Sequence, residues 1–205
     1  MAAPAASVGA VDDFLASVAI LNATSTQVLS SVLADLVGDQ LTLAQLRLLR
    51  LVERQGILRV GDVAAFMRVS NAAASKAVDR LVRVGLLRRT EAKGDRRTLE
   101  ISVTQEGHSL LKAFEVRSGA ILATRLASVD VRGLHSMSDR LDRLSVSLAA
   151  GREATGGCFR CGLFLREECL LRTVGERDCY LQLGPARRDK GGGRAPDRVK
   201  SKAVS

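Results

Sequence analysis

The stretch SNAAASKAVDRLVRVGLLRRTEAKGDRR, residues 70–97, decides the fold. Small and apolar residues recur in its first half at the helical period, and polar and basic residues fill the positions between them. The positions on the apolar side are Ala74, Val78 and Leu81, with Ala77 and Val84 beside them. Ser70 has the side chain of a helix N-cap, and Gly85 stands where a glycine commonly ends a helix. We therefore predict a helix over residues 71–84 with one buried face and one basic face.

A β-hairpin is predicted directly after this helix. Leu86 to Thr90 is typical of one strand, and residues 91–95 are typical of a turn in which Gly94 adopts a positive φ at little cost. In the next strand Leu99, Ile101 and Val103 alternate with polar residues, which indicates one inward and one outward face. The basic residues at the tip are Lys93, Arg96 and Arg97.

Helices are predicted on both sides of this region. Upstream, residues 11–37 form an apolar helix with few charges, and Thr42 with Gln45 has the spacing of a capping box. A helix as apolar as the first one needs a partner to cover it, and we expect that partner to be a second subunit. Downstream, two long helices are predicted, from Thr104 to about Leu126 and over residues 130–150.

The predicted fold class is mainly α with a small β-hairpin wing, a winged helix-turn-helix with a helical dimerisation region. The predicted domains are a disordered N-terminus (1–10), an N-terminal dimerisation helix (11–40), the winged helix-turn-helix (41–104), C-terminal dimerisation helices (105–150), a four-cysteine metal-binding segment (151–184) and a disordered basic tail (185–205).

A set of short motifs occurs between residues 60 and 107: Val63-Ala64, Val69-Ser70, Ser75-Lys76, Val78, Leu81-Val82, Gly85-Leu86-Leu87-Arg88-Arg89, Asp95-Arg96-Arg97 and Val103-Thr104-Gln105-Glu106-Gly107. In these motifs the chain resembles the MarR family of bacterial regulators, over roughly residues 10–150 and most specifically over 60–107. The resemblance implies a homodimer that binds double-stranded DNA and whose terminal helices intertwine.

The charge distribution favours the same partner. The chain carries 31 basic and 22 acidic side chains, a net charge of +9, and residues 68–97 alone carry nine basic and three acidic ones, a net charge of +6. The predicted DNA-binding residues are Ser70, Asn71, Ser75, Lys76, Arg80, Arg83, Lys93, Arg96 and Arg97. Among them, Asn71, Ser75 and Lys76 are the candidates for base contact, Arg80 and Arg83 for phosphate contact, and Arg96 or Arg97 for the minor groove. The alternative is a winged helix that binds only protein and whose charged face is merely solvated.

Four cysteines lie close together near the C-terminus, as Cys158, Cys161, Cys169 and Cys179. Four thiolates at this spacing can converge on one metal ion or one cluster, and a segment this short needs such a centre in order to fold. Some relatives in the resembled family carry Cys-ligated iron–sulfur clusters, which favours a [4Fe–4S] cluster that senses oxidants, nitric oxide or iron. A structural zinc site and metal-free redox thiols are the alternatives.

Other classes of function receive less support. The chain has no nucleotide-binding or hydrolase motif, and Cys158 with Cys161 lacks the βαβ surroundings of a thiol–disulfide oxidoreductase. His108 and His135 are typical of packing or surface positions, so we predict no catalytic residues. A small-molecule effector is a further alternative, although few aromatic residues are available to line its pocket. No uninterrupted apolar run reaches 18 residues, so we expect no membrane partner and a cytoplasmic, nucleoid-associated protein. The basic tail either adds non-specific attraction to DNA or is only solvated.

Overall fold

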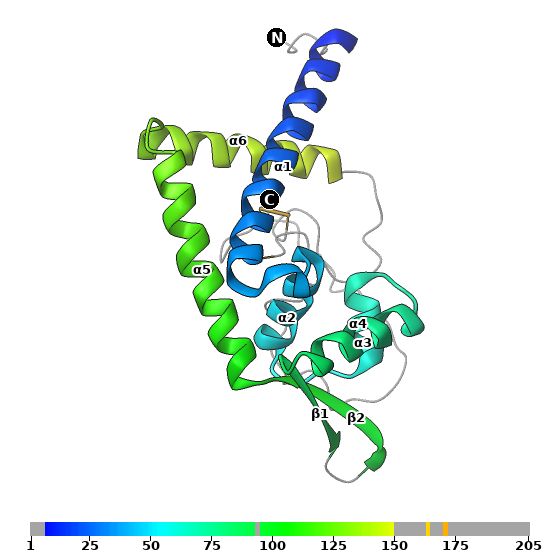
Figure 1. Ribbon diagram of the computed structural model, residues 1–205. Coiled ribbons are helices and arrows are strands. Elements are labelled where there is room, and N and C mark those ends of the chain that lie inside the picture. Colours follow the sequence, from blue (N-terminus) through cyan, green and yellow to red (C-terminus); the bar gives the residue numbers. More distant parts are fainter. Residues whose placement is uncertain (1–6, 93–94, 150–162, 165–169, 172–205) are drawn as a thin grey trace, which may run out of the picture.

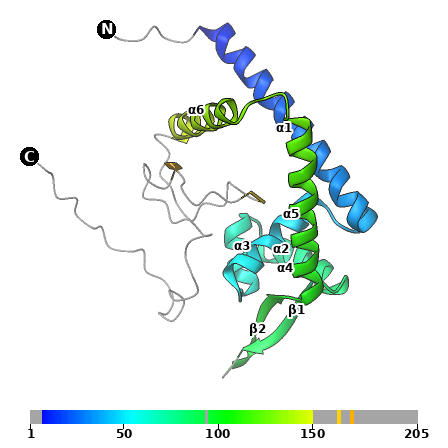
Figure 2. The same cartoon turned by 90° about the vertical axis from the view of Figure 1, so that its left-hand side faces the viewer.

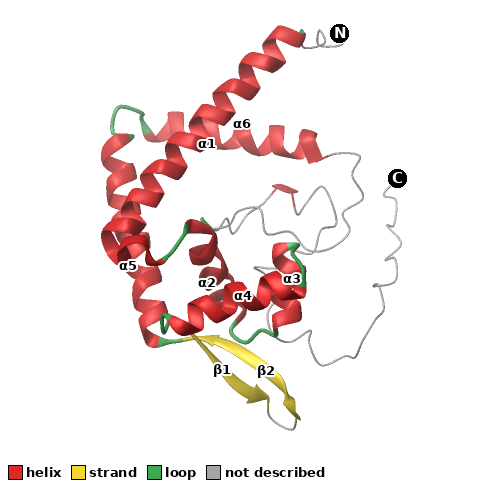
Figure 3. Cartoon of the chain, turned by 45° about the vertical axis from the view of Figure 1, so that its right-hand side comes forward, coloured by secondary structure: helices red, strands yellow, loops and turns green. Residues whose placement is uncertain are grey.

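The computed structural model describes residues 7–92, 95–149, 163–164 and 170–171. Within these ranges the chain is mainly helical, with a single antiparallel hairpin (Figure 3). The elements are, in chain order, α1 (Val8–Val37), the 3-10 helix η1 (Gly38–Gln40), α2 (Leu43–Gln55), α3 (Val60–Met67), α4 (Asn71–Arg83), β1 (Leu87–Ala92), β2 (Asp95–Val103), α5 (Gln105–Arg125) and α6 (Val131–Ala149). The predicted fold class is confirmed.

The predicted caps begin α2 and α5. The Thr42 hydroxyl accepts from the Gln45 backbone N–H at 3.3 Å, and the Gln45 side-chain oxygen accepts from the Thr42 N–H at 2.9 Å, which completes the predicted capping box. The Thr104 hydroxyl accepts from the Gly107 N–H at 3.1 Å and donates to the Gly85 carbonyl at 2.7 Å. One hydroxyl therefore begins α5 and also holds the turn that follows α4.

The core is aliphatic and surrounds α2. Leu46 and Leu49 on one side of α2 are completely buried, and Leu48 and Leu51 on the other side are buried as completely. The reason is that α2 packs against α1, α4, α5 and β2 and is covered from several directions. A one-sided amphipathic pattern therefore underestimates the burial of this central helix.

The hairpin is longer than predicted. Glu91 pairs with Leu99 and, after a shift in register, Ala92 pairs with Asp95, so Glu91, Ala92 and Asp95 of the predicted turn belong to the strands. At the base of the hairpin, Ile101 exchanges backbone hydrogen bonds with Leu58 on the other edge of β2, at 2.7 and 3.1 Å. The predicted inward face of β2 is correct for Ile101 but wrong for Leu99, which is exposed because the outer part of the hairpin projects beyond the body (Figure 1).

α1 begins at Val8, where the Ser7 hydroxyl accepts from the Ala10 N–H at 3.3 Å. The predicted disordered N-terminus, 1–10, is therefore wrong for residues 8–10, which are helical. Only the C-terminal half of α1 has buried side chains, and these are Val28, Leu29, Val32 and Leu33. The N-terminal half projects away from the body, and α6 turns away from α5 at the end of α5 that is remote from the hairpin (Figures 1 and 2).

The N-terminal helix has one further property that bears on the expectation of no membrane partner. In the described part of the chain, one helical stretch, Val8–Gln40, is long and apolar enough to cross a membrane by length and composition. The core helix of a water-soluble protein passes the same test, and the buried C-terminal half of α1 packs against α5. The absence of a membrane partner stays a prediction.

Candidate nucleic-acid interface

A tight turn joins α3 to α4. Arg68 adopts the left-handed conformation, with φ of +53°, and is the one residue other than glycine with a positive φ in the described part of the chain. The Val69 N–H donates to the Ala64 carbonyl at 3.1 Å, which closes the end of α3. The Ser70 hydroxyl then accepts from the Ala73 N–H at 3.2 Å and begins α4, as the sequence predicts. This turn places α4 at a fixed angle against α3.

The two faces of α4 separate as predicted. Ala74, Val78 and Leu81 are completely buried against the rest of the winged helix. On the other side the side chains of four predicted DNA-binding residues are exposed, and these are Asn71, Lys76, Arg80 and Arg83. Ser75 lies at the edge between the two faces and is half-buried, with its hydroxyl 3.5 Å from an oxygen of Asp79. α4 therefore presents a row of cations and short polar groups to solvent.

The hairpin packs against α4 through β1. Arg96 and Arg97 are the second and third residues of β2, near the end of the hairpin, whereas Lys93 lies outside the described residues. Closer to the base, the Arg88 side chain donates across the strands to the Ser102 hydroxyl at 2.9 Å. The structure thus brings two of the three predicted wing residues onto the strand that follows the tip, and contact of any of them with DNA stays a prediction.

An ion pair joins α4 to the hairpin, and the sequence analysis did not predict it. One carboxylate oxygen of Asp79 contacts the guanidinium of Arg89 on β1. The sequence placed Asp79 simply on the polar face of the helix. The opposite charges on two predicted consecutive elements were the available signal, but the direction of the β1 side chains could not be read from so short a strand.

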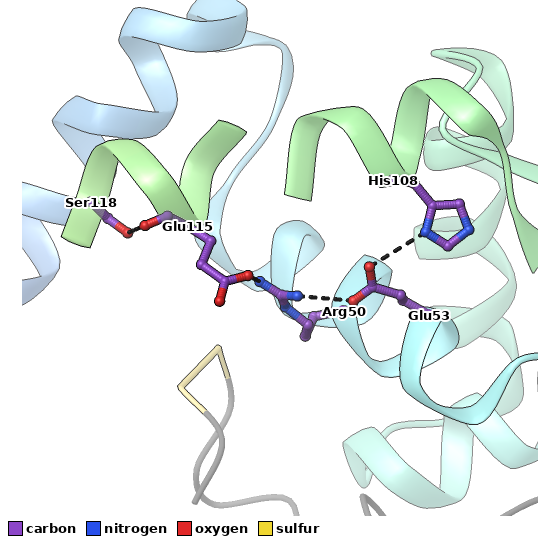
Figure 4. A network of polar contacts seen from close by, with 5 residues as sticks. All are labelled: Arg50, Glu53, His108, Glu115 and Ser118. Carbon is purple, nitrogen blue, oxygen red and sulfur yellow. Dashed lines mark hydrogen bonds and ion pairs between the residues drawn. The ribbon is translucent and has the colours of Figure 1, made fainter. Parts of the chain in front are cut away.

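A second polar network connects α2 to α5 (Figure 4). The buried guanidinium of Arg50 donates to Glu53 at 2.9 Å and to Glu115 at 3.2 Å. His108 lies 3.4 Å from the other oxygen of Glu53, and the Ser118 hydroxyl donates to the Glu115 carbonyl at 3.3 Å. His108 therefore takes part in a structural contact on the surface, in agreement with its predicted packing or surface position.

α1 and α6 carry many exposed apolar side chains, which we call the exposed apolar surface. Its members are Val8, Val11, Leu15, Val18 and Leu21 of α1 with Met137, Leu141, Leu144 and Leu148 of α6. The helix predicted for residues 130–150 is present as α6, but its apolar side chains do not pack extensively against another described element of the same chain. Exposed apolar side chains gathered on two helices are a candidate interaction surface.

The four predicted metal ligands, Cys158, Cys161, Cys169 and Cys179, lie outside the described residues. Among residues 7–92, 95–149, 163–164 and 170–171, no group of three or more histidine, cysteine, aspartate and glutamate side chains is arranged to hold a metal ion. Leu163, two positions after Cys161, is half-buried and packs against the hydrophobic core. The cysteine-bearing part of the chain therefore has at least one described contact with the helical body.

Residues 41–99, which run from α2 into the hairpin, match the model of the MarR family. The chain is 33% identical over 109 residues to the HTH-type transcriptional repressor MdtR of Bacillus subtilis (strain 168), an alignment that covers 52% of this chain and 69% of MdtR.

Solved structures share the fold. A MarR family protein from Bacillus stearothermophilus superposes with a TM-score of 0.61 at 20% identity, over 71% of this chain and 99% of that one. A mutant of MarR from E. coli, solved in complex with operator DNA, gives a TM-score of 0.54 at 15% identity, over 68% of this chain and 99% of that one.

Proposed function

The chain belongs to the MarR family, and from this premise we propose that two copies form a cytoplasmic dimer that binds specific sites in double-stranded DNA. The chain is a transcriptional regulator and not an enzyme. In the proposed complex α4 enters the major groove, where short side chains at its start reach base edges, and the hairpin reaches the adjacent minor groove.

The observation that carries this proposal is the exposed face of α4. Its cations, Lys76, Arg80 and Arg83, lie along one side of a helix whose other side is fully packed, so the whole polar face is available to a ligand. A polyanion fits a surface of this charge, and an α-helix fits the width of the major groove. The relative with bound operator DNA shares this fold, which supports the same use of the fold here.

Charge reversal on α4 tests DNA binding. We expect the wild-type protein to retain DNA from the region upstream of its own gene, with an affinity that falls steeply as salt rises. The double variant K76E/R80E removes two cations per subunit and should weaken this binding by at least about 100-fold at moderate salt. The control is R54E, because Arg54 is an exposed cation on α2, outside the predicted DNA-binding residues and outside the exposed apolar surface. Equal affinity of K76E/R80E and R54E contradicts the proposal.

The exposed apolar surface supports the dimer. A second copy that packs its own α1 and α6 against these helices would cover the side chains that the single chain leaves in water. It would also fix two copies of α4 at a set separation, which is what binding to two half-sites on one face of a duplex requires.

Paired substitutions test the dimer interface. Leu15 of α1 and Ile57, in the loop after α2, are exposed to nearly the same extent, at 51% and 49%, but only Leu15 belongs to the exposed apolar surface. L15E buries a charge if the dimer forms there, so light scattering should detect monomers at micromolar concentration, whereas I57E should remain dimeric. Dimers of unchanged stability in L15E, or monomers in the wild type, contradict this part of the proposal.

We further propose that the four cysteines hold a [4Fe–4S] cluster and that loss of the cluster changes the affinity for DNA. The support is chemical, since thiolate is the ligand that such clusters use, and all four thiols of the chain lie within one short segment. The packing of Leu163 on the core provides a route by which a change in this segment reaches the DNA-binding body. A zinc ion that only holds the segment is the alternative.

Metal analysis separates these alternatives. Protein purified without oxygen should be brown and contain iron and acid-labile sulfide, whereas a colourless protein with one zinc per chain favours the structural site. The variant C158A/C161A should lose the cofactor. If DNA affinity is the same in this variant and in the wild type, with and without the cluster, the sensing proposal is wrong.

A further inference from the structure

We infer that Asp79 and Arg89 are positioning residues that hold the hairpin at the angle to α4 at which both can reach DNA. This inference rests on the proposed DNA binding and deepens it. It names the contact that sets the angle between α4 and the hairpin, the two elements proposed to contact DNA.

The location of Arg89 suits this role. It lies on β1 opposite Ile101, whose side chain is fully buried and whose backbone is bonded to Leu58 on the far edge of β2. Cross-strand partners share a face of the hairpin, so Arg89 leaves the strand on the side that faces the helices. Its guanidinium thus projects from the part of the hairpin where β2 is hydrogen-bonded on both edges.

The location of Asp79 is equally specific. It is the only acidic residue of α4, and it lies among the cations Lys76, Arg80 and Arg83 that are predicted to contact DNA. An unpaired carboxylate at this place would repel phosphate groups. Because its side chain is 44% exposed, burial does not demand its pairing either, and exposed ion pairs add little to stability. The pair with Arg89 therefore matters more for geometry and local charge than for folding.

The carboxylate of Asp79 contacts a residue of the hairpin and a residue of its own helix, α4. One oxygen contacts Arg89 of the hairpin, and the other lies 3.5 Å from the hydroxyl of Ser75, a predicted base-contacting residue. Asp79 thus orients a side chain at the start of α4 and fixes the base of the hairpin at once. A change at this one carboxylate is expected to disturb the two regions together.

The shape of the hairpin amplifies small changes at its base. From Arg89 to Ala92 the strand advances about 10 Å toward the tip. A rotation of about 20° at the base therefore displaces the end of the strand by about 3 Å, which is enough to break a hydrogen bond or ion pair with DNA. Loss of the Asp79–Arg89 pair would accordingly remove the contribution of the hairpin without unfolding the protein.

A double-mutant cycle on DNA affinity tests the inference. The full-length protein and DNA from the region upstream of its gene are used throughout. In the wild type, R96A/R97A should weaken binding by about tenfold, through loss of the predicted minor-groove and phosphate contacts. In the D79N background, which already binds more weakly, R96A/R97A should weaken binding further by less than about threefold. The midpoint of thermal unfolding should change little in D79N, since a structural role alone would lower stability and leave the hairpin effect intact.

Two further variants make the test specific. E91Q removes an exposed carboxylate of β1, and in this control background R96A/R97A should keep its tenfold effect. The exchange D79R/R89D restores an ion pair with reversed charges, and it should restore the effect of R96A/R97A and recover part of the affinity. If D79N folds poorly, the exchange variant D79R/R89D still tests whether an ion pair between these two positions supports the effect of R96A/R97A.

Each result has a definite consequence. A tenfold effect of R96A/R97A in both the wild type and D79N overturns the positioning role. A wild type that binds DNA but is indifferent to R96A/R97A also overturns it, while the proposed function survives on α4 alone. A wild type without salt-dependent binding to any DNA removes the proposed function and the inference with it.

Discussion

The guanidinium of Arg50 on α2 lies 3.2 Å from the carboxylate of Glu115 on α5, so a buried cation connects the winged helix to the helix that leads toward α6. The same guanidinium holds Glu53 of its own helix at 2.9 Å. The two acidic partners differ in burial, since the Glu53 side chain is 23% exposed and the Glu115 side chain 69% exposed. This difference predicts unequal contributions to stability.

Removal of Glu53, the better buried partner of Arg50, should destabilise the protein more than removal of Glu115. E53L leaves the buried guanidinium with a single exposed partner and removes the contact of His108, so we expect the free energy of unfolding to fall by about 2–3 kcal/mol. E115L should reduce it by less than about 1 kcal/mol, because exposed ion pairs contribute little. Urea denaturation followed by circular dichroism measures the free energy of unfolding of both variants. Equal losses in E53L and E115L would contradict the unequal contributions predicted from burial.

Gly107, at the start of α5, should not tolerate a larger residue. A Cβ at this position would lie 2.5 Å from the carbonyl oxygen of Leu86 and 2.6 Å from a side-chain carbon of Val103. We expect G107A to destabilise the protein by about 2–3 kcal/mol through overpacking. The matched control is G61A in α3, where a Cβ meets nothing within 4 Å. This control should be neutral or stabilising by up to about 1 kcal/mol, and a neutral G107A would show that α5 can shift freely.

Arg68 should be replaceable by residues that accept a positive φ. Its φ is +53°, which glycine adopts freely, asparagine adopts more readily than most residues, and β-branched residues adopt rarely. We therefore expect thermal stability to decrease in the order Gly or Asn, Arg, Val at this position, with R68V lower than wild type by at least about 1 kcal/mol. Differential scanning fluorimetry of the three variants tests the order, and an R68V that is as stable as R68G would be inconsistent with it.

Ser70 offers a way to separate helix capping from DNA binding. S70A loses the hydroxyl that accepts from the Ala73 N–H and should destabilise the protein by about 1 kcal/mol. S70D keeps an N-cap acceptor and should be about as stable as the wild type, yet it places a negative charge at the predicted DNA surface and should weaken DNA binding. Denaturation and salt-controlled binding assays on both variants measure the two effects, and full DNA affinity in S70D would remove Ser70 from the predicted interface.

Local sequence signals predicted the DNA-binding module well because each of its features is encoded within a few residues. The caps at Thr42 and Ser70, the helix-ending Gly85 and the alternation at Ile101 and Val103 all depend on near neighbours along the chain, and all of them are present. The separation of α4 into a packed face and a cationic face follows from the helical period in the same way.

The features that were missed depend on contacts between distant parts of the chain. The burial of Leu48 follows from three-dimensional crowding around α2, and the Asp79–Arg89 and Arg50–Glu115 pairs follow from how elements pack. The exposure of Leu99 has the same origin, because the alternation in β2 continues beyond the point at which the core ends. Periodicity states which side of an element is apolar, but not how far its neighbours extend.

The projecting half of α1 has a consequence for the thermodynamics of the protein. Val11 and Leu15 are 42% and 51% exposed in the described part of the chain, so in the proposed dimer the second copy would stabilise this half-helix. Folding and assembly are then linked by mass action, and the melting temperature should rise as the protein is concentrated. The cellular level of the regulator would thereby set both the number of its copies and the fraction of them that is fully folded.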